Sequence, residues 1–270
     1  MSEGLLNNDI FYKFSFVFPI LSTISFLVQA VPLTLLVYVN PTWLHNKYIK
    51  GRPCDEEIEK QLLWGIYYSL RNHMFLFASI ALAFPLLENY LCYVIIWDND
   101  APWVTVSSML QFVAVVYLED YLYYKIHRAF HVYKNLFNFV HALHHSIKRP
   151  VALCGHYMTA SEFFLIGGTV VLTPLLIGTF TSAFGYPVHY KVLFMWIIFR
   201  QWEAAEEHAG FEANFLLAKH FIPGYDGPSF HIFHHLKVIG NYGAVTSIHD
   251  KRHETVSKGY EKYLKGLRQQ

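Results

Sequence analysis

The sequence predicts an all-α integral membrane protein, and three observations agree on this. The 270-residue chain is 54% hydrophobic and 18% aromatic, with only 15% charged residues, which is more apolar than a soluble domain. Several uncharged runs reach the length of a helix that spans a bilayer. None of the sixteen histidines lies in the middle of such a run. We expect two transmembrane helical hairpins plus an N-terminal apolar helix, with a cytosolic helical cap that carries the histidines.

The N-terminal apolar run extends from Phe16 to Val39, 24 residues without a charged group. A helix rises 1.5 Å per residue, so this run exceeds a hydrocarbon core of ~30 Å. The preceding residues lack the basic start and cleavage site of a signal peptide, and we expect them to be retained. The next segment, 40–69, is polar, which predicts an exposed loop followed by a short amphipathic helix.

Four further apolar runs pair into two hairpins. The first pair is separated by the polar turn 97–102, and the second by the breaker Gly185-Tyr186-Pro187. The last run is short for a complete crossing, so the number of crossings stays open. The four runs are 74–96, 103–124, 163–184 and 188–202.

The distribution of basic residues predicts the orientation of these runs. If the two hairpin turns face the lumen, only Lys13 and Lys191 of the 21 basic residues lie on or near the luminal side. Lysine and arginine are enriched on the cytoplasmic side of membrane proteins. We therefore expect the histidine-rich segments to face the cytosol. An odd number of crossings places the N-terminus in the lumen, and re-entry of the first run is the alternative.

Eight histidines form three short motifs, here called boxes. Box one has the spacing HxxxH, and boxes two and three have the spacing HxxHH. Helical residues three or four positions apart share a face, so we expect each box to aim its ring nitrogens at one point. Neutral imidazole binds Zn, Cu, Fe and Ni, and eight imidazoles exceed the four ligands of one structural zinc ion. The boxes therefore predict a histidine-rich dimetal site, from His127 and His131, then His141, His144 and His145, then His231, His234 and His235.

The position of the boxes separates several classes of function. A haem held between transmembrane helices needs ligands deep in the bundle, and transporters place their sites near the bilayer midplane, whereas all three boxes lie at the membrane surface. A metal site above apolar helices favours chemistry on a lipid. The net charge of +1 and the lack of a basic run give no sign of nucleic acid binding. A non-catalytic metal-binding or transporting membrane protein is the alternative from another class.

The segments around the boxes resemble the fatty acid hydroxylase superfamily of integral-membrane di-iron oxygenases. The sequence EDYLYYKIHRAFH, residues 119–131, resembles the superfamily signature EDxxxYxxHRxxH. HALHHSIKRP and HIFHHLKVIGNYG resemble the second and third superfamily boxes in order and spacing. The resemblance covers roughly Leu118 to Gly243 and is closest in motif to C4-methyl sterol oxidases and sterol C5-desaturases.

The resemblance also implies ligands beyond the three boxes. His208, which follows the last apolar run, resembles a further ligand in an HSG-type motif. The superfamily has a histidine-proline pair where this chain has Thr159-Ala160, and His156 lies on the same helical face as Thr159. We therefore expect His156 to fill this gap. The implied metal ligands are His127, His131, His141, His144, His145, His156, His208, His231, His234 and His235.

Acidic residues near the boxes are candidates for orienting these ligands. A metal-bound histidine normally donates its second N–H group to a carboxylate or a carbonyl. Asp120 lies seven residues before His127, two helical turns away on the same face. Glu207 directly precedes His208. Both are predicted to hold ligating histidines in place, and the catalytic residues themselves stay unknown.

The resemblance divides the chain into three parts and implies an activity. We expect an N-terminal membrane region at 1–117, a fatty acid hydroxylase-type catalytic region with the boxes and second hairpin at 118–250, and a polar tail at 251–270. The implied activity is that of a membrane-bound, O2-dependent oxidoreductase with two iron ions, which hydroxylates or desaturates a sterol in sterol biosynthesis, similar to a C4-methyl sterol monooxygenase. A fatty acid or sphingolipid hydroxylase is the alternative.

The implied location is the endoplasmic reticulum membrane. The chain shows neither a glycine-rich dinucleotide fingerprint nor the HPGG element of a fused cytochrome b5 domain. We therefore expect electrons to come from NAD(P)H through separate proteins, cytochrome b5 and its reductase.

Overall fold

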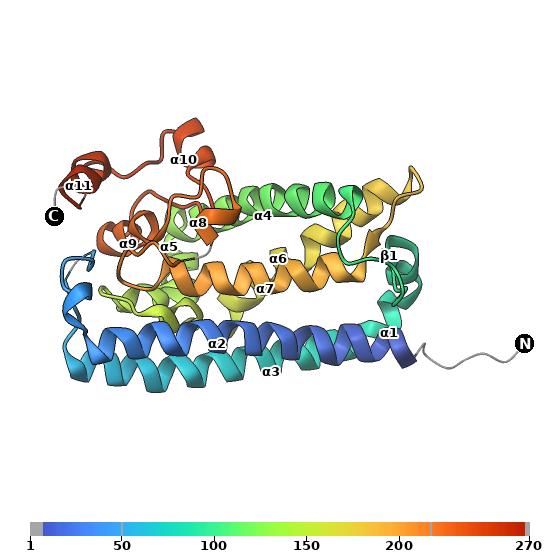
Figure 1. Cartoon of the computed structure of the whole chain (residues 1–270), viewed down its shortest axis with the longest axis horizontal. Coiled ribbons are helices and arrows are strands. Elements are labelled where there is room, and N and C mark those ends of the chain that lie inside the picture. The colour runs from blue at the N-terminus through green and yellow to red at the C-terminus, as the bar shows by residue number, and fades with distance from the viewer. Residues whose placement is uncertain (1–7, 50, 217, 268–270) are drawn as a thin grey trace, which may run out of the picture.

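Five long helices run side by side along the length of the molecule (Figure 1). The computed structural model describes residues 8–49, 51–216 and 218–267. The histidine-bearing segments gather at one end of the bundle, together with the short helices of the C-terminal part. The long helices are α2 (Phe18–Val39), α3 (Asp55–Val94), α4 (Val106–Val132), α6 (Ala160–Ser182) and α7 (Tyr190–Glu207).

The N-terminal apolar run is helical, as predicted. The short helix α1 (Asn8–Tyr12) and the π-helical turn η1 (Lys13–Val17) lead directly into α2. Helix α2 ends at Asn40, which adopts a left-handed conformation with φ of 53°. Asparagine tolerates this conformation better than most residues, so it terminates the helix at little cost.

The prediction of a short helix separate from the second apolar run was wrong. Helix α3 is continuous over 40 residues. It begins with a capping box in which the Glu57 carboxylate accepts a hydrogen bond from the Cys54 backbone N–H at 3.1 Å. Acidic residues in the first turn also complement the helix dipole. Residues 55–69 of the polar segment are therefore the start of the same helix that carries the apolar run.

Among the residues that the structure describes, three stretches of helix are long and apolar enough to cross a membrane: Asp9–Val39, Asp55–Val94 and Ala160–Ser182. Helices α4 and α7 do not reach this apolar level, although the sequence predicted spans within both. Each carries buried polar groups where it packs inside the bundle, such as Glu119 on α4 and Arg200 on α7. The Arg200 guanidinium pairs with the Glu119 carboxylate at 3.4 Å and also with Glu203. An all-α membrane protein is thus confirmed, whereas the two-hairpin topology stays a prediction.

The two hairpin turns lie together at the end of the bundle that is remote from the histidines (Figure 1). Strand β1 (Ile95–Ile96) pairs in parallel with β2 (Val188–His189), a small sheet that the sequence did not predict. The buried ammonium group of Lys191 donates to the backbone carbonyls of Asn99 and Ala101. The two turns therefore share one side of the molecule, as the charge distribution requires.

The opposite end is a cap of short helical segments that follow the ends of α4 and α7. Two hydrophobic clusters hold the long helices together and reach beneath this cap. The segments of the cap are α5 (Lys134–Leu136), η3 (Phe137–His141), η4 (His144–Ser146), η5 (Ala152–His156), α8 (Ala218–Phe221), α9 (Pro228–Lys237), α10 (Ile248–Arg252) and α11 (Tyr260–Leu267).

Candidate metal centre

Nine of the ten predicted ligands converge in two adjacent groups. In each group, one ring nitrogen per histidine lies within 4.8 Å of those of all the other members. The groups are in contact, since the ring centroids of His145 and His235 are 4.8 Å apart. The five-histidine group contains His127, His131, His141, His145 and His234, and the four-histidine group contains His144, His208, His231 and His235.

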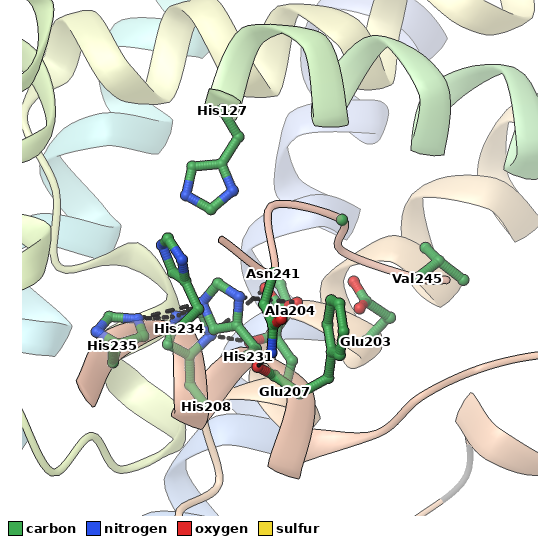
Figure 2. A network of polar contacts seen from close by, with 12 residues as sticks. His127, Glu203, Ala204, Glu207, His208, His231, His234, His235, Asn241 and Val245 are labelled. Carbon is green, nitrogen blue, oxygen red and sulfur yellow. Dashed lines mark hydrogen bonds and ion pairs between the residues drawn. The ribbon is translucent and has the colours of Figure 1, made fainter. Parts of the chain in front are cut away.

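The prediction that each box aims at a single point was wrong for boxes two and three. Box two lies on π-helical and 3₁₀ turns, and its i, i+4 pair His141 and His145 joins one group while His144 joins the other. Box three lies on the α-helix α9, where His231 and His235 share a face and His234 turns to the other group. Figure 2 shows His127 reaching from α4 toward the histidines of α9 and His208.

The spacing of the Nε2 atoms matches the edges of a metal coordination shell. In the five-histidine group, His141 Nε2 is 3.1 Å from His127 Nε2 and 2.9 Å from His145 Nε2. In the four-histidine group, His231 Nε2 is 3.0 Å from His208 Nε2 and 3.1 Å from His235 Nε2. With metal–nitrogen bonds of about 2.1 Å, two neighbouring ligands are about 3.0 to 3.4 Å apart at octahedral and tetrahedral angles. The nitrogens are therefore already at ligand distances.

Backbone carbonyls fix the tautomers of most of these histidines. The Nδ1–H of His127 donates to Tyr242 O at 2.8 Å, that of His234 to Gly240 O at 2.7 Å, and that of His208 to Ala204 O at 2.9 Å. Longer bonds of the same kind join His144 to Tyr157 and His235 to Ile147. A proton held at Nδ1 leaves the lone pair of Nε2 free. The Nε2 lone pairs of neighbouring histidines then point toward each other. A cation bound between them would stabilise this arrangement.

Two carboxylates lie beside the centre, one near each histidine group. Glu162, in the first turn of α6, accepts from His141 Nδ1 at 2.7 Å. Glu207 lies 3.5 Å from His208 Nδ1 and 3.8 Å from His231 Nδ1. Glu207 thus lies next to the centre, and its role in orienting a ligand stays a prediction, whereas Glu162 was missed. A signal for Glu162 was present, because Thr159-x-x-Glu162 is a helix-start pattern at the beginning of an apolar run.

Asp120 supports the centre less directly than predicted. Its carboxylate accepts from the Val245 and Thr246 backbone N–H groups at 3.0 and 3.2 Å and from the Thr246 hydroxyl at 2.6 Å. It thereby holds the loop whose Tyr242 carbonyl binds His127. Asp250, another residue that the prediction missed, accepts from the Tyr242 N–H of the same loop at 2.9 Å. Asp120 therefore positions a loop and does not bind a box histidine.

Burial keeps the clustered imidazoles neutral at physiological pH. Eight of the nine side chains are buried, and His131 is half-buried. Burial lowers the pKa of His144 to about 4 and that of His131 to about 2, with nearby imidazoles contributing to the shift at His131. Burial also lowers the pKa of His231 and His235. Neutral imidazole is the form that binds metals.

His156 lies outside both groups. Its ring stacks on Phe26 with centroids 3.6 Å apart, and its Nδ1 lies 3.3 Å from the Ser69 hydroxyl. Thr159 caps α6 by accepting from the Glu162 N–H at 3.1 Å, and it donates to the Val140 carbonyl at 2.8 Å. The superfamily resemblance predicts a histidine at position 159. Thr159 stands there instead and caps helix α6 next to His141.

A cavity of about 60 Å³ adjoins the four-histidine group. His144 and His208 contribute to its wall, and no member of the five-histidine group does. Its apolar wall comes mainly from helices α2, α3, α6 and α7. Polar side chains interrupt this wall, among them Ser22, His156, Glu162, Arg200, Gln201 and Glu207. The cavity is below the ~300 Å³ of common small-molecule sites, so it fits a small reacting group and not a whole lipid.

A comparison with known families identifies the histidine-rich half of the chain. The family model described as "Fatty acid hydroxylase" matches residues 112–255, which is just over half of the chain. The protein belongs to the fatty acid hydroxylase family. The match includes all nine clustered histidines, Glu162 and Glu207, so the centre lies wholly inside the family region.

Several known proteins are similar to this member of the fatty acid hydroxylase family. Methylsterol monooxygenase 1 of Danio rerio is 29% identical over 62% of this chain and 53% of its own length. Methylsterol monooxygenase erg25B of Aspergillus fumigatus is 31% identical over 54% of this chain and 48% of its own length. Very-long-chain aldehyde decarbonylase GL1-11 of Oryza sativa subsp. japonica is 31% identical over 53% of this chain and 50% of its own length. The chain spans about half the length of these relatives, and no solved structure matches it.

Proposed function

We propose that this protein is a membrane-bound, O2-dependent monooxygenase that hydroxylates a methyl group at C4 of a sterol. The observation that carries the proposal is the pair of buried, neutral histidine groups beside a cavity walled by apolar helices. The similarity to methylsterol monooxygenases of two organisms supports the sterol as substrate.

The two histidine groups would hold one iron ion each. Imidazole suits iron, and the Nε2 spacing and the tautomers described above fit a metal in each group. Nine histidines make up the proposed ligand set, and His156 is left out because it lies apart from both groups. When bound, the iron pair supplies the O2 activation needed to attack an unactivated C–H bond.

The protein's own contribution is to hold the ligands and to orient the substrate in a dry site. Glu162 and the backbone carbonyls fix the direction of the imidazoles, and Glu207 lies near two of them. The apolar wall, which includes Leu76, Phe163 and Ile166, excludes water from the space next to His144 and His208. A C4 methyl group fits this space, while the sterol rings would extend between the helices and displace apolar side chains.

The proposed location and partners follow from the charge distribution of the chain and from the proposed activity. The histidine end would face the cytosol at the endoplasmic reticulum membrane, with Lys13 and Lys191 at the luminal end. Electrons would come from NAD(P)H through cytochrome b5 and its reductase. Conversion of a C4 methyl group to an alcohol consumes one O2 and two electrons and releases water, so an external donor is required.

A second candidate is the conversion of a very-long-chain aldehyde. It is favoured by the rice aldehyde decarbonylases, which are 31 to 32% identical to this chain over 53% of its length. This identity is as high as that of the methylsterol monooxygenases. The two candidates differ in substrate and share the metal centre.

Reconstitution separates the candidates. The purified full chain is placed in liposomes with iron, cytochrome b5, its reductase and NADPH, and receives either a 4,4-dimethylsterol or a C26 aldehyde. We expect a 4-hydroxymethyl sterol, detected by mass spectrometry, and no product with His208→Ala. Formation of alkane from the aldehyde with an unchanged sterol would select the second candidate. A preparation that binds no iron yet transports zinc would contradict both.

A further inference from the structure

A group of polar side chains, here called the polar wall, interrupts the apolar lining of the cavity. It consists of Gln201 on α7, Ser22 on α2 and His156 in η5, which all contribute to the cavity surface. Gln201 and His156 are 7% and 5% exposed, and Ser22 is fully buried. Polar groups this deep in an apolar bundle normally have all their hydrogen-bond partners.

The internal bonds of this wall fix the direction of the Gln201 side chain. His73 Nδ1–H donates to the Ser69 carbonyl at 2.8 Å, which leaves its Nε2 as an acceptor. The Ser22 hydroxyl lies 3.0 Å from this Nε2 and donates to it. The Gln201 Nε2 amide group then donates to the Ser22 oxygen at 2.9 Å. This chain of donors leaves Gln201 Oε1 pointing away from Ser22.

Gln201 Oε1 is a buried acceptor without a hydrogen-bond partner among the described residues. An acceptor in that position costs folding free energy unless a ligand or a water supplies a donor. His156 stands on the same wall, and its Nδ1 is already occupied by the Ser69 hydroxyl at 3.3 Å. In the tautomer that accepts from Ser69, the Nε2–H of His156 is a donor without a hydrogen-bond partner in the described part of the chain. The wall thus offers an acceptor and a donor, which are the complements of a hydroxyl group.

We propose that Gln201 and His156 recognise a hydroxyl group of the substrate and so determine its specificity. This inference rests on the proposed function and sharpens it. A sterol carries its hydroxyl group on C3, the carbon next to C4. A C3 hydroxyl that donates to Gln201 Oε1 and accepts from His156 Nε2 would keep the C4 methyl groups close to His144 and His208, which line the same cavity. A lipid without a hydroxyl group near the reacting carbon leaves Gln201 unpaired.

The test compares a 4,4-dimethylsterol with its 3-deoxy analogue. The dissociation constant of each is measured on the detergent-purified, iron-loaded full chain, and kcat/KM is measured in the reconstituted system. We expect the wild-type protein to favour the 3-hydroxy compound roughly tenfold to a hundredfold in both quantities, because the analogue leaves a buried acceptor unpaired. In Gln201→Met this preference should fall below about threefold, mainly through weaker binding of the 3-hydroxy compound.

Gln111→Met is the matched control. Gln111 is also 7% exposed, but its amide donates to the Tyr186 carbonyl at 3.0 Å at the other end of the bundle. This control should keep the full hydroxyl preference, and all variants should keep two iron ions. Should Gln201→Met fail to fold, Ser22→Ala takes its place, since it removes the acceptor that orients the Gln201 amide and should lower the preference partially.

The outcomes distinguish this inference from the proposed function. If the wild-type protein hydroxylates both sterols equally well, or if Gln201→Met keeps the preference, the function stands and the inference is overturned, with a water as the partner of Gln201. If the wild-type protein with two iron ions neither binds nor oxidises either sterol, the proposed function is wrong and the inference falls with it.

Discussion

The two histidine groups differ in their surroundings. The five-histidine group is enclosed by α4, the cap and the loop around Tyr242, and it contributes nothing to the cavity wall. The four-histidine group contributes His144 and His208 to that wall. A metal with four protein ligands also has more free coordination positions than one with five. The two groups are therefore not equivalent, and we expect the substrate to meet the four-histidine group.

Their support differs as well. In the five-histidine group, Glu162 bonds His141 at 2.7 Å, whereas Glu207 remains 3.5 and 3.8 Å from the nearest nitrogens of the four-histidine group. A close carboxylate orients its histidine more firmly than a distant one. The carboxylate contact is thus closer in the five-histidine group than in the group that adjoins the cavity.

The largest effect is expected when one ligand is removed from each group. His234→Ala and His208→Ala should each lower the iron content from two ions toward one per chain, measured by plasma mass spectrometry. Turnover should fall at least about a hundredfold, since even residues that only support ligands change affinity by 10- to 100-fold. His220→Ala, which changes an exposed histidine outside both groups, is the control. Two ions retained in either cluster variant would contradict the assignment.

The next effect tests the difference between the two carboxylates. Glu162→Leu removes the acceptor for His141 and should lower the metal affinity of the five-histidine group by about 10- to 100-fold. Glu162→Gln keeps an acceptor oxygen and should retain most of the affinity. Glu207→Leu should cost less than about tenfold because its contacts are longer. Iron titration with a competing chelator measures all three, and an equal loss for Glu162→Leu and Glu207→Leu would remove the distinction.

A third change acts on the cavity and leaves the metals in place. Gly167 lines the cavity, and an added Cβ would meet only Phe163 atoms at 3.9 Å. Gly167→Leu should therefore fold, reduce the space for substrate and lower kcat/KM roughly tenfold. Gly168→Leu is the matched control, because Gly168 is exposed with nothing within 4 Å of an added Cβ. Equal effects of the two variants would show that substrate does not enter along this wall.

The smallest effect on metal content is expected for His156→Ala. This variant should keep two iron ions, because His156 stacks on Phe26 outside both groups. If His156 contacts the substrate, this variant should bind the 3-hydroxy sterol more weakly than the wild-type protein does. Loss of one iron ion on dialysis would return His156 to the ligand set.

Local spacing was sufficient to predict much of the candidate centre. Histidines repeated at i, i+3 and i, i+4 predict metal ligands with little dependence on the rest of the fold. The place of Glu207 near the centre is predicted by its position next to His208. The apolar runs predicted a helical membrane protein because hydrophobic length is also a local property. The break expected before residue 74 was wrong, since a polar first turn and an apolar continuation are compatible with one helix, α3.

Only the tertiary structure decided how the histidines are divided. His141 and His145 of box two join His234 of box three, whereas His144 joins His231 and His235. Likewise, Glu162 meets His141 and Asp120 meets the Thr246 loop across separations of 21 and 126 residues. A sequence motif records which residues can bind a metal, because that depends on side-chain chemistry and on the nearest helical turn. Which of them bind the same metal depends on the packing of α4, α7, α9 and the turns of box two, and such long-range contacts have no signal in the spacing.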